Sequence, residues 1–112
     1  MRLNKRKEGN VSILEITGSI DINNAEYLQE QIEKNFMGGE NHLVMDLTEV
    51  DYLDSSGLGQ LVAAFKMSVQ HGRKVVLAGV NEDVLNEMRL TRLDTLFDFA
   101  TNVDEAIGNL NS

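Results

Sequence analysis

The sequence is short and acidic. Its 112 residues include ten basic and eighteen acidic side chains, for a net charge of −8 at pH 7. Hydrophobic residues make up 42% of it, which suffices for one core, and no cysteine is present to form a disulfide, a thiolate metal site or a cysteine nucleophile. We therefore expect one domain over residues 1–112, with no cofactor and no metal.

The charge is unevenly distributed along the chain. Four of the ten basic residues lie in the first seven positions, so the remainder carries six basic and eighteen acidic residues. A body of this charge repels nucleic-acid backbones and anionic lipid, and we expect neither as a direct partner. No apolar run approaches the roughly 20 residues that cross a bilayer, and the first residues lack the apolar stretch of a signal peptide. We therefore expect a cytoplasmic protein.

The first third of the chain predicts a hairpin followed by a helix. Residues 3–7 form a weak strand pattern, and residues 11–17 alternate apolar and polar side chains with one slip at residue 14. A helix is expected to begin with Asn23 or Asn24 as its N-cap. The pair Gly38-Gly39 is expected to end it, with a glycine at the C′ position.

The rest of the chain alternates apolar strands with amphipathic helices. Strands are predicted at 42–47, 74–79 and 96–99, and helices at 58–69, 84–88 and 103–110. Strands separated by helices of this length need crossover connections and at least partly parallel pairing, with the helices packed on the sheet. The pattern therefore predicts an α/β fold with a mixed sheet of four to five strands and about four helices.

The segment from residue 50 to residue 59 carries the clearest chemical signal. Polar and small residues gather there directly before an apolar helix, and Asp54 or Ser55 would cap that helix. A phosphate at this helix start would be stabilised by free backbone amides and the helix dipole. Gly57 and Gly59 each cost a helix interior about 0.5–1 kcal/mol relative to alanine. They indicate either the close approach of another backbone or close packing on the sheet.

This segment does not match the common catalytic or nucleotide-binding motifs. Gly59 is not followed by Lys-Ser or Lys-Thr, as a phosphate-binding P-loop requires. Gly-Leu-Gly at 57–59 lacks the third small residue of a dinucleotide fingerprint, and no Gly-x-Ser-x-Gly nucleophile motif is present. We therefore do not expect an enzyme, and a nucleotide-binding module is the least favoured class of function.

The sequence resembles a known family. Asp-Ser-Ser-Gly-Leu-Gly at 54–59, after an apolar strand and before an apolar helix, resembles the signature of bacterial anti-sigma factor antagonists, which are single STAS domains. Segments 18–21, 44–50 and 90–97 resemble three further elements of that family, so the resemblance spans most of the chain. It implies a STAS-like α/β fold.

The resemblance also implies a partner switch. In this family the unphosphorylated antagonist binds an anti-sigma factor that is also a serine kinase, and binding releases a sigma factor. The kinase then phosphorylates a serine of the antagonist, and a serine phosphatase resets it. The acceptor maps to Ser55, with Ser56 as the alternative. The implied partner-binding residues are Asp21, Asn23, Asp54, Ser55, Ser56, Gly57, Leu58 and Gly59.

Other interpretations of these residues stay open. Asp54 either orients the serine hydroxyl or only caps the helix, and Asp21 and Asn23 also suit a turn and a helix start. A phosphate adds about −1.5 to −2 charge, which Asp51 and Asp54 would repel. The alternative function is a STAS scaffold subunit that does not switch, as in a stressosome-like or lipid-transport ABC complex.

Overall fold

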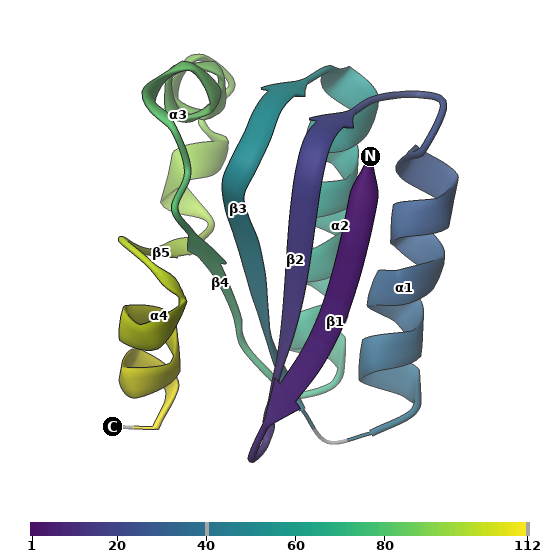
Figure 1. The fold of residues 1–112 in the computed structure, drawn as a ribbon, viewed down its shortest axis with the longest axis vertical. Helices are drawn as coiled ribbons and strands as arrows, with labels where there is room; N and C mark the ends of the chain where they lie inside the picture. The colour runs from purple at the N-terminus through teal and green to yellow at the C-terminus, as the bar shows by residue number, and fades with distance from the viewer. Residues whose placement is uncertain (40, 112) are drawn as a thin grey trace.

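The computed structural model describes residues 1–39 and 41–111, and the described chain forms five strands, four α-helices and one 3-10 turn (Figure 1). In chain order these elements are β1 (Arg2–Glu8), β2 (Val11–Ile20), α1 (Ala25–Met37), β3 (His42–Leu53), α2 (Ser55–Gln70), β4 (Val75–Ala78), α3 (Glu82–Leu90), the 3-10 turn (Leu93–Thr95), β5 (Asp98–Ala100) and α4 (Val103–Leu110). None of the described helices is both long and apolar enough to span a membrane.

The strands form a mixed sheet in the order β1-β2-β3-β4-β5. β1 pairs antiparallel with β2, which confirms the N-terminal hairpin, and the other three pairs are parallel. Each parallel pair is joined through a helix, because parallel strands need a long crossover connection. The predicted α/β class, with a mixed sheet and four packed helices, is confirmed.

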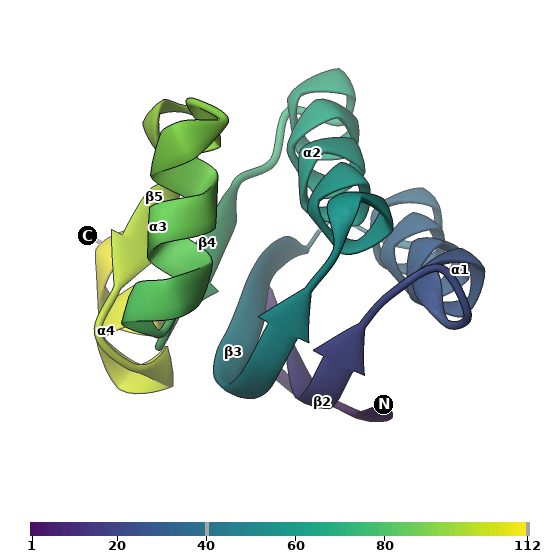
Figure 2. The ribbon, with the colours of Figure 1, turned by 90° about the horizontal axis from the view of Figure 1, so that it is seen from above.

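Helices cover both faces of this sheet. Helices α1, α2 and α3 lie on one face and α4 lies on the other (Figure 2). Side chains of the first three share the larger core cluster, and α4 covers a smaller cluster with Val11, Ile13, Val44 and Val76. Because successive strands are added in one direction, crossovers of the same hand place their helices on the same face. Only the terminal helix is left for the opposite face.

β2 is buried on both faces, which explains the slip in its alternation. Ile13 belongs to the cluster under α4, and Leu14 belongs to the cluster under α1 and α2. Neighbouring side chains of a strand point to opposite faces, so a strand covered on both sides carries apolar residues at consecutive positions.

Two strands run further than their sequence pattern predicted. β2 continues to Ile20 through irregular register, with Gly18 at φ 96°, and β3 continues to Leu53, where Tyr52 pairs with Ser19 and Leu53 with Ile20. Residues 50–53 were expected in a loop and lie in a strand. Pairing with β2 holds this mixed polar and apolar stretch extended, and nothing local in the sequence indicates it.

Helix α1 begins after the expected N-cap residue, but its cap bond and its end differ from expectation. Asn24 occupies the N-cap position, but its side chain bonds the Asp21 N–H and the Ser19 carbonyl instead of the helix. Gly38 follows the helix in right-handed geometry, with φ −91°, so no left-handed glycine ends it. The last strand lies at Asp98–Ala100 rather than 96–99, because Leu96 follows the 3-10 turn.

Candidate functional site

Asp54 connects three chain segments at the point where β3 becomes α2. Its Oδ1 accepts the Gly57 N–H at 2.9 Å, which confirms Asp54 as the N-cap. Its Oδ2 accepts the Ile22 N–H at 3.2 Å, and its own N–H donates to the Ile20 carbonyl at 3.2 Å. The start of α2 is therefore tied to the end of β2 and the loop that follows.

Gly57 allows this junction to close. A Cβ at this position would lie 2.5 Å from the Ile20 carbonyl oxygen and 3.1 Å from Leu53 Cδ2, whereas one at Gly59 would meet nothing within 4 Å. Of the two explanations for these glycines, the close approach of another backbone holds for Gly57. Neither explanation holds for Gly59, which is exposed.

The two serines differ in accessibility. Ser55 is the first residue of α2, and it is exposed and lines a cavity. Ser56 is half-buried and is not among the residues that line this cavity. An incoming phosphoryl donor can therefore approach Ser55 more directly than Ser56.

The cavity beside Ser55 has a volume of about 650 Å³ and lies between the β3–α2 junction and α3. We call it the Ser55 cavity. Four carboxylates and no cation are found among the described residues that line it; the carboxylates are Asp51, Asp54, Asp83 and Glu87. The negative potential of these groups favours a basic ligand surface.

Large apolar side chains lie exposed around the same junction. Leu90 is 80% exposed and Tyr52 is 56% exposed, and both line the Ser55 cavity. Ile22, in the loop bonded to Asp54, is 75% exposed. Exposed apolar residues beside polar ones are typical of protein-binding surfaces.

One asparagine bonds the start of helix α3 to β3. Asn81 caps α3 by accepting the Val84 N–H at 2.9 Å, and its Nδ2 donates to the Val50 carbonyl at 2.8 Å. A single side chain therefore caps the helix and bonds its start to β3. Residues of both elements line the Ser55 cavity.

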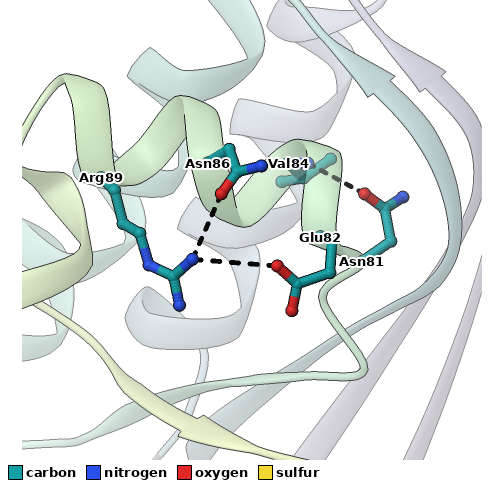
Figure 3. A network of polar contacts seen from close by, with 5 residues as sticks. All are labelled: Asn81, Glu82, Val84, Asn86 and Arg89. Carbon is teal, nitrogen blue, oxygen red and sulfur yellow. Dashed lines mark hydrogen bonds and ion pairs between the residues drawn. The ribbon is translucent and has the colours of Figure 1, made fainter.

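The cation of α3 lies outside that cavity. Figure 3 shows Arg89 in contact with Asn86 and Glu82 of the same helix. Its Nη1 is 3.2 Å from Asn86 Oδ1 and 3.8 Å from Glu82 Oε2. Arg89 lines a different cavity, on the side of β5. It therefore does not neutralise the carboxylates that face Ser55.

The structure places the remaining sequence-predicted residues around the same junction. Asp21 and Asn23 lie in the loop between β2 and α1, where Asp21 Oδ1 accepts the Asn23 N–H at 2.9 Å. Their neighbour Ile22 is bonded to Asp54, so this loop adjoins the start of α2, although neither residue lines the Ser55 cavity. Leu58 is buried and lines the Ser55 cavity.

The sequence analysis did not predict that α3 lines the Ser55 cavity. Asp83, Glu87 and Leu90 line the Ser55 cavity, but α3 was recognised only by its apolar stripe. The positions i, i+4 and i+7 of these three residues place them on one helix face. This spacing was the available signal, yet only the fold shows that the face adjoins Ser55.

Comparison with known proteins shows the family. The model of the STAS domain matches residues 2–106, and the chain is 33% identical over 94 residues to the anti-sigma-B factor antagonist of Listeria monocytogenes, covering 84% of this chain and 82% of that protein. The chain belongs to the STAS domain family. The resemblance to anti-sigma factor antagonists drawn from the sequence is confirmed.

Solved structures share the fold. An anti-sigma factor antagonist from Mycobacterium paratuberculosis has a TM-score of 0.88 at 23% identity, over 99% of this chain and 94% of that one. The unphosphorylated anti-sigma factor antagonist SpoIIAA has a TM-score of 0.77 at 12% identity, over 99% of both chains. SpoIIAA from Bacillus has also been solved in a phosphorylated form, with a TM-score of 0.76 at 15% identity over 96% of this chain and 98% of that one.

Proposed function

We propose that this chain is a cytoplasmic anti-sigma factor antagonist, without catalytic activity of its own, that is switched by phosphorylation of Ser55. In its unphosphorylated form it binds an anti-sigma factor with serine kinase activity and so releases a sigma factor. The observation that carries the proposal is the position of Ser55, which is the exposed first residue of α2 and lines an acidic cavity. SpoIIAA, which shares the fold, is known in a phosphorylated form.

The surroundings of Ser55 suit a partner surface that is basic with an apolar patch. Cations of the anti-sigma factor would face the carboxylates of the Ser55 cavity, and apolar side chains would cover Tyr52 and Leu90. Asp21, Asn23 and Gly59 would extend the contact along the adjoining loop and helix. In contrast, Gly57 and Leu58 are buried and would shape the surface from below.

Phosphorylation would reverse the binding by local electrostatics. A phosphate on Ser55 adds about −1.5 to −2 charge beside four carboxylates, and it is stabilised by the positive end of α2. The phosphorylated domain thus keeps its fold, and its surface toward the anti-sigma factor carries an additional dianion. A dianion buried in the contact is costly unless the partner supplies additional cations, so the complex dissociates. A serine phosphatase would restore the binding form.

The test is phosphorylation in vitro by the purified anti-sigma factor kinase of the same organism with ATP. We expect peptide mass spectrometry to find phosphate on Ser55, to lose it in Ser55→Ala, and to retain it in the matched control Ser56→Ala. The phosphorylated protein should bind the kinase at least about tenfold more weakly. Phosphate on Ser56 instead would move the acceptor by one residue.

A different result would favour a scaffold. If a stable complex forms, neither serine takes up phosphate, and Ser55→Ala leaves the complex unchanged, the chain is a STAS subunit that does not switch. Such an outcome would contradict the proposed switch.

A further inference from the structure

A second cavity lies at the opposite end of β2 from Ser55. It has a volume of about 370 Å³ and lies between the end of β1, the start of β2 and the last turns of α1. We call it the Asn35 cavity. Its lining residues are Lys5, Arg6, Lys7, Ser12, Lys34, Asn35, Gly38 and Asn41. It is roughly 25 Å from Ser55, because strands rise about 3.3 Å per residue.

The charge of the Asn35 cavity is opposite to that of the rest of the chain. In the strand register Lys5 lies opposite Leu14 and Lys7 lies opposite Ser12, so both lysines share the sheet face that α1 covers. Lys34 adds a third ammonium from the last turn of α1. None of these lysines has an ion-pair partner among residues 1–39 and 41–111, and no carboxylate is found among the described lining residues.

A buried amide provides a second, independent observation. Asn35 is only 4% exposed, and neither its Nδ2 nor its Oδ1 has a hydrogen-bond partner within the described chain. Lysine at a helix end compensates the dipole, and lysine on an edge strand discourages pairing with another chain. Neither effect explains an unpaired amide that lines the same cavity, because leaving such a group unsatisfied destabilises the fold.

We infer that the Asn35 cavity is a binding site for a small phosphate monoester that also carries a hydroxyl group. The ammonium groups of Lys5, Lys7 and Lys34 would face the phosphate oxygens. The Nδ2 of Asn35 would donate to the ligand, and its Oδ1 would accept from the ligand hydroxyl. A volume of about 370 Å³ falls within the range of small-ligand sites.

The geometry also predicts how the affinity depends on salt. The cavity borders the carbonyl end of α1, where the helix dipole is negative, so backbone amides of that helix do not hold the phosphate. Exposed lysines supply the attraction, and salt screens exposed charges. We expect the affinity to fall as the salt concentration rises.

The test is a titration of the full chain with glycerol 3-phosphate, followed by ¹H–¹⁵N NMR. We expect saturable shifts of the Asn35 side-chain amide and of the Ser12 backbone amide, with a dissociation constant of about 1 mM or tighter. Signals at Ser55 should stay unchanged, which separates this site from the proposed switch. Glycerol should produce no saturable shift. Inorganic phosphate should bind more weakly than glycerol 3-phosphate, because it has no carbon-bound hydroxyl group that reaches Asn35 while the phosphate contacts the lysines.

Two variants and one control distinguish a binding site from a structural role. Asn35→Leu should weaken binding at least about tenfold while leaving the fold as stable or more stable, because it removes an unsatisfied buried amide. Lys34→Gln should weaken binding and reduce its salt dependence, whereas Lys66→Gln, an exposed lysine on α2, should do neither. If Asn35→Leu does not fold, Lys34→Gln still decides the question.

Several results would overturn the inference. The first is that titration with glycerol 3-phosphate does not saturate. The second is that Lys34→Gln and Lys66→Gln weaken the binding of glycerol 3-phosphate equally. A further arm uses vesicles of phosphatidylcholine with and without phosphatidic acid. Binding to the phosphatidic acid vesicles alone, without binding to glycerol 3-phosphate, would replace the soluble ligand with a lipid headgroup and would contradict the inference as stated.

Discussion

The carboxylate of Asp54 holds the backbone of Ile22, a residue 32 positions earlier in the chain. The same side chain caps α2 through the Gly57 N–H. One aspartate therefore stabilises a helix and also positions the loop between β2 and α1 beside that helix. Asp54 therefore joins two segments of the proposed partner surface through its own hydrogen bonds.

The two bonds of Asp54 can be separated by substitution. Asp54→Ala removes both and should lower the free energy of unfolding by about 0.5–2 kcal/mol, the usual cost of a lost N-cap. Asp54→Asn keeps an oxygen that accepts the Gly57 N–H, but its amide NH₂ group faces the Ile22 N–H. The free energy of unfolding should therefore fall less in Asp54→Asn than in Asp54→Ala. Urea unfolding measures both values. Equal stability of Asp54→Ala and the unmodified protein would contradict the capping role.

The glycine pair of α2 offers a matched comparison. Gly57→Ala places a methyl group against the Ile20 carbonyl and should destabilise the fold by about 1–3 kcal/mol. Gly59→Ala meets open space and should stabilise the helix by about 0.5–1 kcal/mol. Thermal unfolding of the two variants should therefore move in opposite directions. A shift of the same sign in both would show that close approach at position 57 is not the constraint.

Asn81 is expected to stabilise the position of α3, which lines the Ser55 cavity. Asn81→Asp keeps the cap of α3 but loses the donor to the Val50 carbonyl. The free energy of unfolding should therefore fall by about 1–3 kcal/mol. The backbone amides of α3 should also exchange hydrogen faster. The matched control is Asn102→Asp at the start of α4. Asn102 caps in the same way, and its Nδ2 donates to no other described residue. Equal effects of the two substitutions would show that the Val50 contact contributes nothing.

His42 makes the stability depend on pH. Its Nδ1 accepts the Lys74 N–H at 3.0 Å, and burial, followed by the charges of Arg73 and Lys74, lowers the pKa of His42 below its ordinary value of 6.5. The unfolded chain therefore binds a proton more readily than the folded one. The contribution of His42 is fully present above pH 6.5 and is lost as the pH falls through and below that value.

Unfolding by urea at pH values between 5 and 8 measures this dependence. His42→Asn keeps an acceptor near the position of Nδ1 but does not titrate, so the slope of stability against pH should become flatter in this range. An unchanged slope in His42→Asn would assign the pH dependence to other groups.

The local elements of this fold follow from the sequence because their signals are local. Apolar stripes at helical spacing predicted α2 and α4, and the residues before the α2 stripe predicted an N-cap at Asp54 or Ser55, of which Asp54 is confirmed. The lengths of β2 and β3 do not follow in this way. Residues 48–53 are mixed polar and apolar, and only pairing with β2 keeps them extended as far as Tyr52 and Leu53.

The candidate site was likewise determined at two levels. The sequence by itself indicated the family motif, Ser55 as the expected acceptor, and Asp54 or Ser55 as the cap, because these residues are neighbours along the chain. Only the tertiary structure decided that Asp83 and Glu87 of α3 line one cavity with Ser55, and that Lys7 and Lys34 line another with Asn35. These groups come from separate elements, and their distances depend on how helices pack on a sheet rather than on any local preference of the chain.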